Sequence, residues 1–505
     1  MGKRPHVAVI GAGLAGLRCT DILIQNGARV TLFEARNRVG GRVHQEKIHE
    51  HLIDLGPNWI HGTGKNPIAA VAEATGTVLA DFEGNQALIA TDGKVLDDDL
   101  ASKIADVMWT TIEKAFEYSN THKETIPADR SLLDFLREQV DKTDLSTTEK
   151  ALCVETSRMW GAYVGDPIER QSLKFFCLEE CIDGNNYFVA STYKNILKHV
   201  ARAALHHADI RFNQPIVKIE SEPRTSPSKV TLTTAHGESS QFDEVVVTCP
   251  LGWLKRNKAA FTPSLPPRLI QAIDSISYGR LEKVYVTFPR AFWHANNPSP
   301  TSKYRSFENP TFAQFLNPDY TEHPDNILWN QECISLAALP GPCAHPTLLF
   351  YTFGPCATYI VTKLAHLDPS SPEYFTFLDT FLHPFYSRLH GYSPTSPDCK
   401  PLAFAATKWQ TDPYAGNGSY CNFQVGLTQG DRDIEVLRDG LGPDRRVWFA
   451  GEHTAPFVAL GTTTGAYWSG ERAAGQICKV YGLGRLGIGM ERDDSLPSAV
   501  PKGLL

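Results

Sequence analysis

Long hydrophobic runs are missing from this sequence, and no apolar stretch approaches the ~18 residues of a membrane-spanning helix. An excess of basic residues is also missing, because 49 Lys and Arg stand against 56 Asp and Glu and the net charge is −7. A chain without a basic surface has little attraction for nucleic acid or anionic membranes. We therefore expect neither as a partner.

Paired cysteines and a targeting segment are missing as well. The 11 cysteines are an odd number without a CxxC pair or metal-ligand spacing, so we expect reduced thiols and no metal. The first residues lead directly into an apolar strand, without the hydrophobic core of a signal peptide. The final residues, KGLL, differ from the SKL peroxisomal signal. We expect a cytoplasmic monomer, with a peroxisome reached by another route as the alternative location.

The N-terminal region is predicted to form one βαβ unit. Val7–Ile10 and Val30–Phe33 are short apolar runs typical of buried parallel strands, and an apolar stripe predicts a helix from about Leu14 to Asn26. The sequence GAGLAG at residues 11–16 joins the first strand to the helix and matches G-x-G-x-x-G. This combination predicts that the unit binds a dinucleotide cofactor.

Each part of this turn has a physical role in binding a pyrophosphate. Gly11 allows the tight turn, Gly13 lets the backbone come close to the phosphates, and Gly16 permits close packing of the helix on the strand. The helix N-terminus adds N–H donors and a partial positive charge. Glu34 ends the second strand, where a carboxylate can accept hydrogen bonds from ribose hydroxyls. FAD and NAD share these features, so the turn leaves the choice of cofactor open.

Strands of the same buried character recur at residues 245–248 and 447–450. We therefore expect an α/β fold whose cofactor domain is assembled from separated segments, with a substrate domain inserted between them. The cofactor domain is assigned to residues 1–95, 205–290 and 400–480. The substrate domain is assigned to residues 96–204 and 291–399. Residues 481–505 are expected to be a loose tail, and the Pro-, Asn- and Ser-rich stretch 296–346 is expected to form long loops.

Further motifs are spread along the chain between residues 11 and 476. They are GAGLAGL at 11–17, EARNRVGGR at 34–42, DLGPNWIHG at 54–62, VVTCPLGWLK at 246–255, GRLEKVYVTF at 279–288, KWQTDPYAGNGSY at 408–420 and FAGEHTAPFVALGTTTGAYWSGERAAGQ at 449–476. Together they resemble the flavin-containing amine oxidase family, and the string WIHG at 59–62 is similar to acetylpolyamine and spermine oxidases of animals and fungi. The resemblance implies a glutathione-reductase-like, Rossmann-type FAD domain and an α+β substrate domain with a six-stranded sheet.

The resemblance also implies which residues contact the cofactor. The expected FAD-binding residues are Gly11, Gly13, Ala15, Gly16, Glu34, Ala35, Arg36, Arg42, Gly56, Asn58, Trp59, Val217, Trp409, Gly451, Glu452, Thr462 and Thr463. Among them, Thr463 begins a helix whose N–H groups face the N1–C2=O edge of the flavin. Reduced flavin gathers negative charge there, and a helix N-terminus stabilises that charge.

Lys283 is the main catalytic candidate. It interrupts the mostly apolar predicted strand Leu281–Phe288, and periodicity alone would place it on a solvated face. The resemblance implies instead a buried lysine that holds a water against flavin N5. Burial would lower its pKa, and its role would be oxygen activation and proton handling.

His61, Tyr420 and Thr462 are implied to contact the substrate amine, and His61 and Tyr420 are predicted catalytic residues beside Lys283. Tyr420 matches one aromatic wall of the monoamine oxidase cage, whereas Thr462 stands where the second aromatic wall would be. Monoamine oxidases attach their flavin through a cysteine directly before this tyrosine, and Ser419 stands in that place. We therefore expect FAD to be bound without a covalent link.

A group of acidic residues resembles the segment that lines the polyamine tunnel. Glu179, Glu180 and Asp183 precede Tyr187 in this segment. Carboxylates there could hold distal ammonium groups through charge-assisted hydrogen bonds, while a solvated acidic face is the alternative. We predict Glu180, Asp183 and Tyr187 as substrate-binding residues.

The resemblance implies a polyamine oxidase-like reaction. A hydride from the carbon beside a secondary amine would pass to flavin N5, and O2 would be reduced to H2O2, leaving an aldehyde and a shorter amine. One alternative is an oxidase of another amine, such as a monoamine, a specialised-metabolism amine or an amino acid. A chromatin-associated demethylase-like protein and a catalytically silent flavin-binding protein are alternatives of another class.

Overall fold

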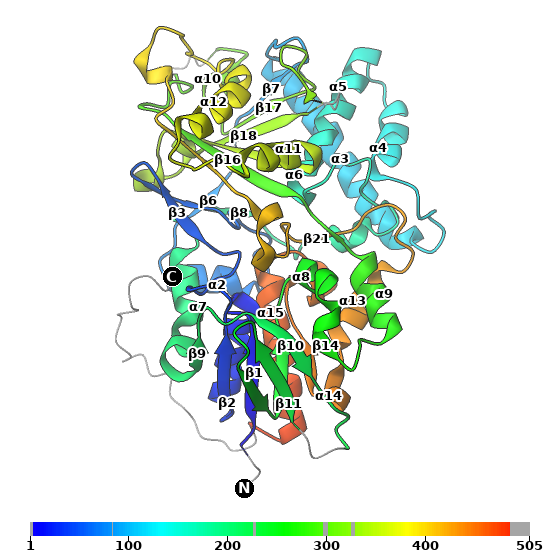
Figure 1. Ribbon diagram of the computed structural model, residues 1–505. Helices are drawn as coiled ribbons and strands as arrows, with labels where there is room; N and C mark the ends of the chain where they lie inside the picture. The colour runs from blue at the N-terminus through cyan, green and yellow to red at the C-terminus, as the bar shows by residue number, and fades with distance from the viewer. Residues whose placement is uncertain (1–3, 83, 226–228, 296–300, 325–328, 485–505) are drawn as a thin grey trace.

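The computed structural model describes residues 4–82, 84–225, 229–295, 301–324 and 329–484. These residues form two lobes, which lie one above the other in Figure 1. The lower lobe contains a parallel sheet and the upper lobe a six-stranded sheet. Within the described ranges, no helix is both long and apolar enough to cross a membrane.

A five-stranded parallel sheet forms the centre of the lower lobe, with the strand order β22-β13-β1-β2-β9. The strands are β1 (His6–Ile10), β2 (Arg29–Phe33), β9 (Asp209–Arg211), β13 (Glu244–Val247) and β22 (Val447–Phe449). Successive side chains of a strand point to opposite faces. Val7 and Val9 of β1 accordingly pack on helices, whereas Ala8 and Ile10 pack on a second sheet. Because both faces are covered, the central strands β1, β13 and β22 are mostly apolar.

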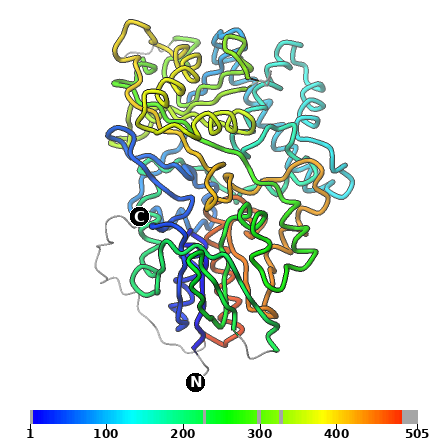
Figure 2. Tube along the Cα trace, viewed as in Figure 1, coloured from blue at the N-terminus to red at the C-terminus, as the bar shows by residue number. Residues whose placement is uncertain are grey.

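Helices cover one face of this sheet and a smaller sheet covers the other. The helices are α1 (Leu14–Gln25), α7 (Lys194–His207) and α15 (Thr463–Tyr481). The smaller sheet has the order β12-β11-β10-β14 and consists of β10 (Ile216–Glu220), β11 (Val230–Thr234), β12 (Ser239–Phe242) and β14 (Phe261–Thr262). The lobe is completed by α8 (Leu251–Arg256), α9 (Pro267–Ser275), α13 (Gly430–Asp439) and α14 (Gly442–Arg445). Figure 2 shows the N-terminal and C-terminal segments, blue and red, side by side in this lobe, as the packing of α1 on α15 requires.

The upper lobe contains the six-stranded sheet, with the order β20-β16-β19-β18-β17-β7. Its strands are β7 (Gln86–Ile89), β16 (Leu281–Thr287), β17 (Phe312–Phe315), β18 (Gln331–Ser335), β19 (Thr347–Phe353) and β20 (Ala403–Ala406). All neighbours are antiparallel except β17 and β7. Val284 and Val286 of β16 pack with α11 (Gly354–Leu364) and α12 (Pro372–Tyr386). The alternate residue Lys283 therefore lies on the opposite face of the sheet.

A helical group stands beside this sheet. It contains α3 (Asp98–His122), α4 (Leu132–Asp141) and α5 (Thr147–Ser157), followed by the short helices η1 (Arg158–Trp160), α6 (Gly161–Val164) and η2 (Phe176–Glu179). Capping boxes at Ser131 and Ser146 start α4 and α5, since each serine accepts a hydrogen bond from the backbone three residues on.

Small elements complete the fold. They are β3 (Gln45–Ile48), β4 (His51–Asp54), β5 (Trp59–Ile60), α2 (Pro67–Ala74), β6 (Leu79–Asp81), β8 (Tyr187–Val189), β15 (Ser277–Tyr278), α10 (Arg305–Glu308) and β21 (Cys421–Asn422). Of these, β5, β8 and β6 form a three-stranded sheet.

The sheets place some segments differently from the expected domain boundaries. β7, β16 and β20 belong to the six-stranded sheet, although residues 1–95, 205–290 and 400–480 were assigned to the cofactor domain. Helix α7, assigned to the substrate domain, packs on α1 in the lower lobe. We propose boundaries that follow the sheets. The stretch 296–346 also contains β17 and β18, so the expectation of long loops there was wrong for these residues, whose side chains are mostly buried in the sheet. The expected tail lies outside the described residues beyond residue 484.

Candidate active site

A cavity of about 770 Å³ runs between the lobes. Its wall begins at the glycine turn after β1, passes β16 of the six-stranded sheet and ends among side chains of α3 and η2. Its size lies in the ~300–1,000 Å³ range of ligand sites. The cavity therefore links the predicted cofactor turn to the predicted substrate region.

The glycine turn has the geometry that the motif predicts. Gly11 has φ +105°, a conformation that favours glycine, and its N–H donates to the Phe33 carbonyl at 2.7 Å. Gly13 lines the cavity, and a Cβ added there would meet no atom nearer than the Gly40 carbonyl oxygen at 4.0 Å. A Cβ on Gly16, by contrast, would lie 1.9 Å from the Gly11 carbonyl oxygen. Gly13 thus keeps space open for a ligand, and Gly16 lets α1 pack on the turn.

Glu34 lies directly after β2 and lines the cavity. Its carboxylate accepts hydrogen bonds from the backbone N–H groups of Ala12 at 2.8 Å and Arg36 at 2.9 Å. Burial raises the pKa of Glu34, and these two donors oppose that rise. The carboxyl is therefore held at the end of β2, beside the turn, where a ribose is expected.

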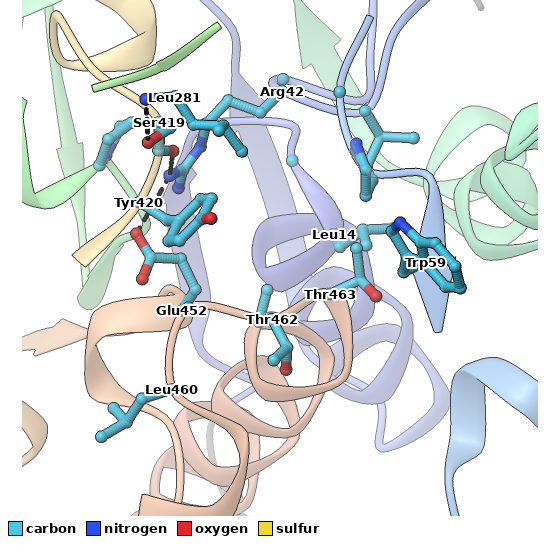
Figure 3. A pocket seen from close by; sticks show the side chains of 18 of the residues that line it. Leu14, Arg42, Trp59, Leu281, Ser419, Tyr420, Glu452, Leu460, Thr462 and Thr463 are labelled. Carbon is cyan, nitrogen blue, oxygen red and sulfur yellow. Dashed lines mark hydrogen bonds and ion pairs between the residues drawn. The ribbon is translucent and has the colours of Figure 1, made fainter. Parts of the chain in front are cut away.

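Arg42 joins the early and late cofactor segments (Figure 3). It forms an ion pair with Glu452 at 3.0 Å and donates to the Ser419 carbonyl at 2.5 Å and the Tyr278 hydroxyl at 3.0 Å. Burial disfavours the charge of both partners, but the Arg42 guanidinium holds the pKa of Glu452 below its usual value. The direct contact of Arg42 is with Glu452, and its predicted contact with a phosphate stays a prediction.

The N-terminus of α15 faces the cavity, as the placement of Thr462 and Thr463 in Figure 3 shows. Thr462 is the N-cap residue, and its hydroxyl accepts a hydrogen bond from the Gly465 N–H at 2.9 Å. The helix therefore begins where it was expected. Its partial positive charge is available to a group in the cavity that gains negative charge.

Lys283 is buried, with 5% of its surface exposed, and it lines the cavity. Its ammonium group donates to the Gly56 carbonyl and to Asn58 Oδ1, both in the segment expected beside the flavin. Burial lowers its pKa well below the ordinary value, and the nearby Asp54 carboxylate opposes that shift. The solvated face that periodicity allowed is therefore wrong for this lysine, because the apolar neighbours on β16 belong to a sheet covered on both faces.

Asp54 is a feature that sequence reasoning missed. It is buried, and its carboxylate accepts hydrogen bonds from Gln45 Nε2 at 2.6 Å and from the Tyr193 N–H at 3.0 Å. Burial raises its pKa. Asp54 is the first residue of the DLGPNWIHG motif, which also contains Gly56 and Asn58. The sequence does not show that this motif packs against Lys283, so it could not predict that Asp54 lies near the lysine.

The substrate end of the cavity contains four further predicted residues. His61, Tyr420, Glu180 and Asp183 all line it. Burial lowers the pKa of His61, so the imidazole is neutral near pH 7. The Tyr420 hydroxyl donates to the Tyr163 carbonyl, which fixes the ring against the cavity. Glu180 accepts a hydrogen bond from Asn120 Nδ2 at 2.9 Å.

Aromatic rings and further carboxyls also lie at this end, and Trp109 and Glu332 among them were not predicted. Trp109, Trp160 and Tyr163 form an aromatic wall, in which the Trp160 and Tyr163 rings stack with centroids 5.0 Å apart. Glu179, which belongs to the acidic group noted in the sequence, is half-buried in the lining. Glu332 is buried there, and burial raises its pKa to about 7. Glu332 was missed because its segment was expected to be a loop.

Most of the predicted cofactor residues line the cavity, and three predicted site residues do not. Those in the lining are Gly11, Gly13, Ala15, Glu34, Ala35, Arg36, Arg42, Gly56, Asn58, Trp59, Trp409, Gly451, Glu452, Thr462 and Thr463. Gly16 lies behind the turn, and Tyr187 pairs with Ile60 in the sheet of β5 and β8. The side chain of Val217 is 50% exposed, and residues 214–216 before it form the wall instead.

This cavity fits a flavin dinucleotide. Open space in front of Gly13 can take a pyrophosphate, a carboxylate stands at the ribose position, and a helix N-terminus and a buried lysine stand farther along the same wall. The fold and the site together define a dinucleotide-dependent oxidoreductase of the flavoprotein class.

Comparison with known proteins assigns the family. The model for the flavin containing amine oxidoreductase family matches residues 14–478, so the chain belongs to that family. It is therefore an FAD-dependent amine oxidase.

Individual relatives agree with this assignment. The chain is 26% identical over 497 residues to probable polyamine oxidase 4 of Arabidopsis thaliana, covering 96% of this chain and 89% of the relative. It is 28% identical over 487 residues to lysine-specific histone demethylase 1 homolog 3 of Oryza sativa subsp. indica, covering 93% of this chain and 54% of that protein. The solved structure of putrescine oxidase bound to putrescine superposes with a TM-score of 0.68 at 18% identity, covering 94% of this chain and 99% of that one. This last likeness confirms the expected fold.

Proposed function

We propose that this amine oxidase acts on polyamine-like substrates, at the carbon beside a secondary amine. The observation that supports the proposal is the chemistry of the cavity beyond Lys283. Its lining there combines aromatic rings with the carboxyls of Glu113, Glu179, Glu180, Asp183 and Glu332. Aromatic faces and carboxylates are the groups that attract alkylammonium chains.

The same lining disfavours amino acids as substrates. A substrate carboxylate would need a cationic partner, most often an arginine fork. Among the described residues that line the cavity, the arginines are Arg36 and Arg42, and each already has an acidic partner. Both belong to the cofactor end. The substrate end therefore offers negative charge where an amino acid needs positive charge.

The chain's own residues have defined tasks in this proposal. FAD, when bound, accepts the hydride from the carbon beside the amine and passes the electrons to O2. His61 and Tyr420 border the space for the amine, and the neutral imidazole of His61 does not repel an ammonium chain. Lys283 holds a proton at Nζ between Gly56 and Asn58, with a lowered pKa that allows the proton to be exchanged near pH 7.

The test is a panel of substrates for the purified, FAD-loaded protein. Peroxide release should be fastest with spermine, spermidine or their acetylated forms, and slow with simple monoamines and amino acids. Anaerobic addition of the best amine should bleach the flavin, which separates an enzyme from an inert flavin-binding protein. The proposal is lost if the polyamines give no peroxide while a monoamine or an amino acid does.

The panel should include a histone peptide with a methylated lysine, because one relative is named a histone demethylase. Peroxide release with this peptide and none with polyamines would favour that second function. Gel filtration and imaging of a tagged chain test the proposed monomer and its cytoplasmic or peroxisomal location.

A further inference from the structure

Three segments that are far apart in the chain meet beside Tyr420. They are the loop after α6, the residues just before β16 and the segment of β21. The Gly279 N–H donates to the Tyr420 carbonyl at 2.7 Å, and the Arg280 N–H donates to the Gly165 carbonyl at 2.9 Å. The backbone therefore joins these segments, and the side chain of Asp166 lies between them.

Asp166 connects the segments through both oxygens of its carboxylate. It is buried, with 3% of its surface exposed, and it lies outside the cavity lining. One oxygen accepts hydrogen bonds from the Arg280 guanidinium, with Nε at 3.0 Å. The other accepts from Gln424 Nε2 at 3.0 Å and from Asn422 Nδ2 at 3.4 Å, and Asn422 Nδ2 also donates to the Val164 carbonyl at 2.9 Å. One carboxylate thus binds the segment before β16 and the segment after Tyr420 at the same time.

Tyr420 depends on these contacts more than Lys283 does. β21, which follows Tyr420, is two residues long and pairs with the equally short β15. The Tyr420 hydroxyl donates to the Tyr163 carbonyl, three residues before Asp166. Lys283, by contrast, lies in the seven-residue strand β16, which pairs with both β19 and β20. The sheet therefore fixes Lys283, whereas the loop of Asp166 holds Tyr420 at its hydroxyl and at the strand that follows it.

We propose that Asp166 is a positioning residue, which holds the Tyr420 ring in the orientation that aligns the substrate amine for oxidation. This inference rests on the role of Tyr420 in the proposed function. Reacting groups need a near-attack geometry, and a displacement of about 1 Å caused far from the chemistry can slow a step by about 100-fold. Because Asp166 lies outside the cavity lining, it acts through Tyr420 and does not touch the substrate.

Asp166→Asn removes one of the two acceptor oxygens. The remaining oxygen would stay on the Arg280 guanidinium, and the new Nδ2 would face the donors of Asn422 and Gln424. In anaerobic stopped-flow measurements, the limiting rate of flavin reduction by a saturating amine should fall by about 10- to 100-fold. Flavin that dithionite has reduced should be reoxidised by O2 at close to the wild-type rate, because the sheet still fixes Lys283.

Three further variants control for stability and for the route of the effect. Asp433→Asn is the matched control, since Asp433 is also buried and paired, with Arg268 at 2.5 Å, but lies outside the cavity lining in the lower lobe. It should lose stability and keep both flavin rates. Gln424→Glu places a like charge opposite Asp166 and should slow reduction in the same way, even if Asp166→Asn does not fold. Combining Asp166→Asn with Tyr420→Phe should give losses that do not add, because both changes act on one ring.

Several outcomes overturn the proposal. Equal slowing of reduction and reoxidation would show a general loss of structure, and an unchanged rate of reduction would remove Asp166 from positioning. Additive losses in the double variant would overturn the route through Tyr420. A selective loss of reduction in Asp433→Asn as well would show that any weakened ion pair has this effect.

The choice of amine separates this proposal from the proposed function. The measurements use the amine that the substrate panel ranks first, so a failure of the polyamine proposal leaves them valid. If no amine reduces the flavin, amide hydrogen exchange of the FAD-loaded protein decides the role of Asp166. Residues 419–424 should exchange about 10-fold faster in Asp166→Asn than in the wild type or in Asp433→Asn, and residues 281–287 should not. Unchanged exchange at residues 419–424 would overturn the proposal.

Discussion

The glycine turn allows cofactor binding and folding to be perturbed separately. Gly13 has φ −76° and ψ 179°, an extended conformation that alanine adopts without strain. Its added methyl would meet no protein atom nearer than 4.0 Å, and Gly13 lines the cavity. Gly16 lies three residues on, and its added methyl would lie 1.9 Å from the Gly11 carbonyl oxygen. Gly13→Ala should therefore act on FAD, and Gly16→Ala should act on the fold.

The magnitudes follow from these distances. Gly13→Ala should leave the unfolding free energy of the apoprotein unchanged or raise it by up to about 1 kcal/mol, since alanine restricts the unfolded chain. The methyl should weaken FAD binding by about 5- to 150-fold, because overpacking costs about 1–3 kcal/mol. Gly16→Ala should lower the unfolding free energy of the apoprotein by at least about 1–3 kcal/mol, the same overpacking cost, because backbone atoms must move apart.

Two measurements on each variant check this reasoning. Urea unfolding of the apoprotein gives stability, and titration with FAD followed by flavin fluorescence gives affinity. Wild-type FAD affinity in Gly13→Ala would refute the claim that the pyrophosphate lies against this turn. Wild-type stability in Gly16→Ala would refute the packing of α1 on Gly11.

Three further predictions concern the rest of the cavity. Glu332 has an ordinary pKa of 4.5 when unfolded and about 7 when folded, so the folded state holds its proton longer and stability falls as pH rises between these values. Glu332→Gln should therefore raise the unfolding free energy by roughly 3 kcal/mol above pH 7 and leave it unchanged below pH 4, and equal urea midpoints at pH 8 would contradict this. Lys283→Met should slow reoxidation of the reduced flavin by O2 on the order of 100-fold in stopped-flow measurements and slow its reduction by the amine much less; equal slowing of both steps would remove the assigned role. Acid precipitation should release all flavin into the supernatant, because Ser419 cannot carry a thioether link, and a yellow pellet would show a covalent bond.

Local sequence determined the cofactor turn, the first strands and the start of α15. Each depends on residues within one strand–turn–helix unit, where glycine conformation, helix capping and apolar patterning act over a few neighbours. For that reason Glu34 and Thr462 lie where they were expected. The family motifs also predicted that Lys283 is buried, whereas periodicity alone had placed it on a solvated face.

Only the tertiary structure decided how the substrate end is built. Lys283 lies opposite Tyr351, which lies opposite Glu332, and this placement depends on the register of β16, β19 and β18, which meet only in the folded sheet. Register is set by side-chain packing across strands, and a shift of one residue would turn Glu332 to the other face. Asp54 and Lys283, and likewise Arg42 and Glu452, are far apart in the chain and come together only in the folded structure. Long-range packing therefore decided which buried charges have partners and which remain available to a substrate.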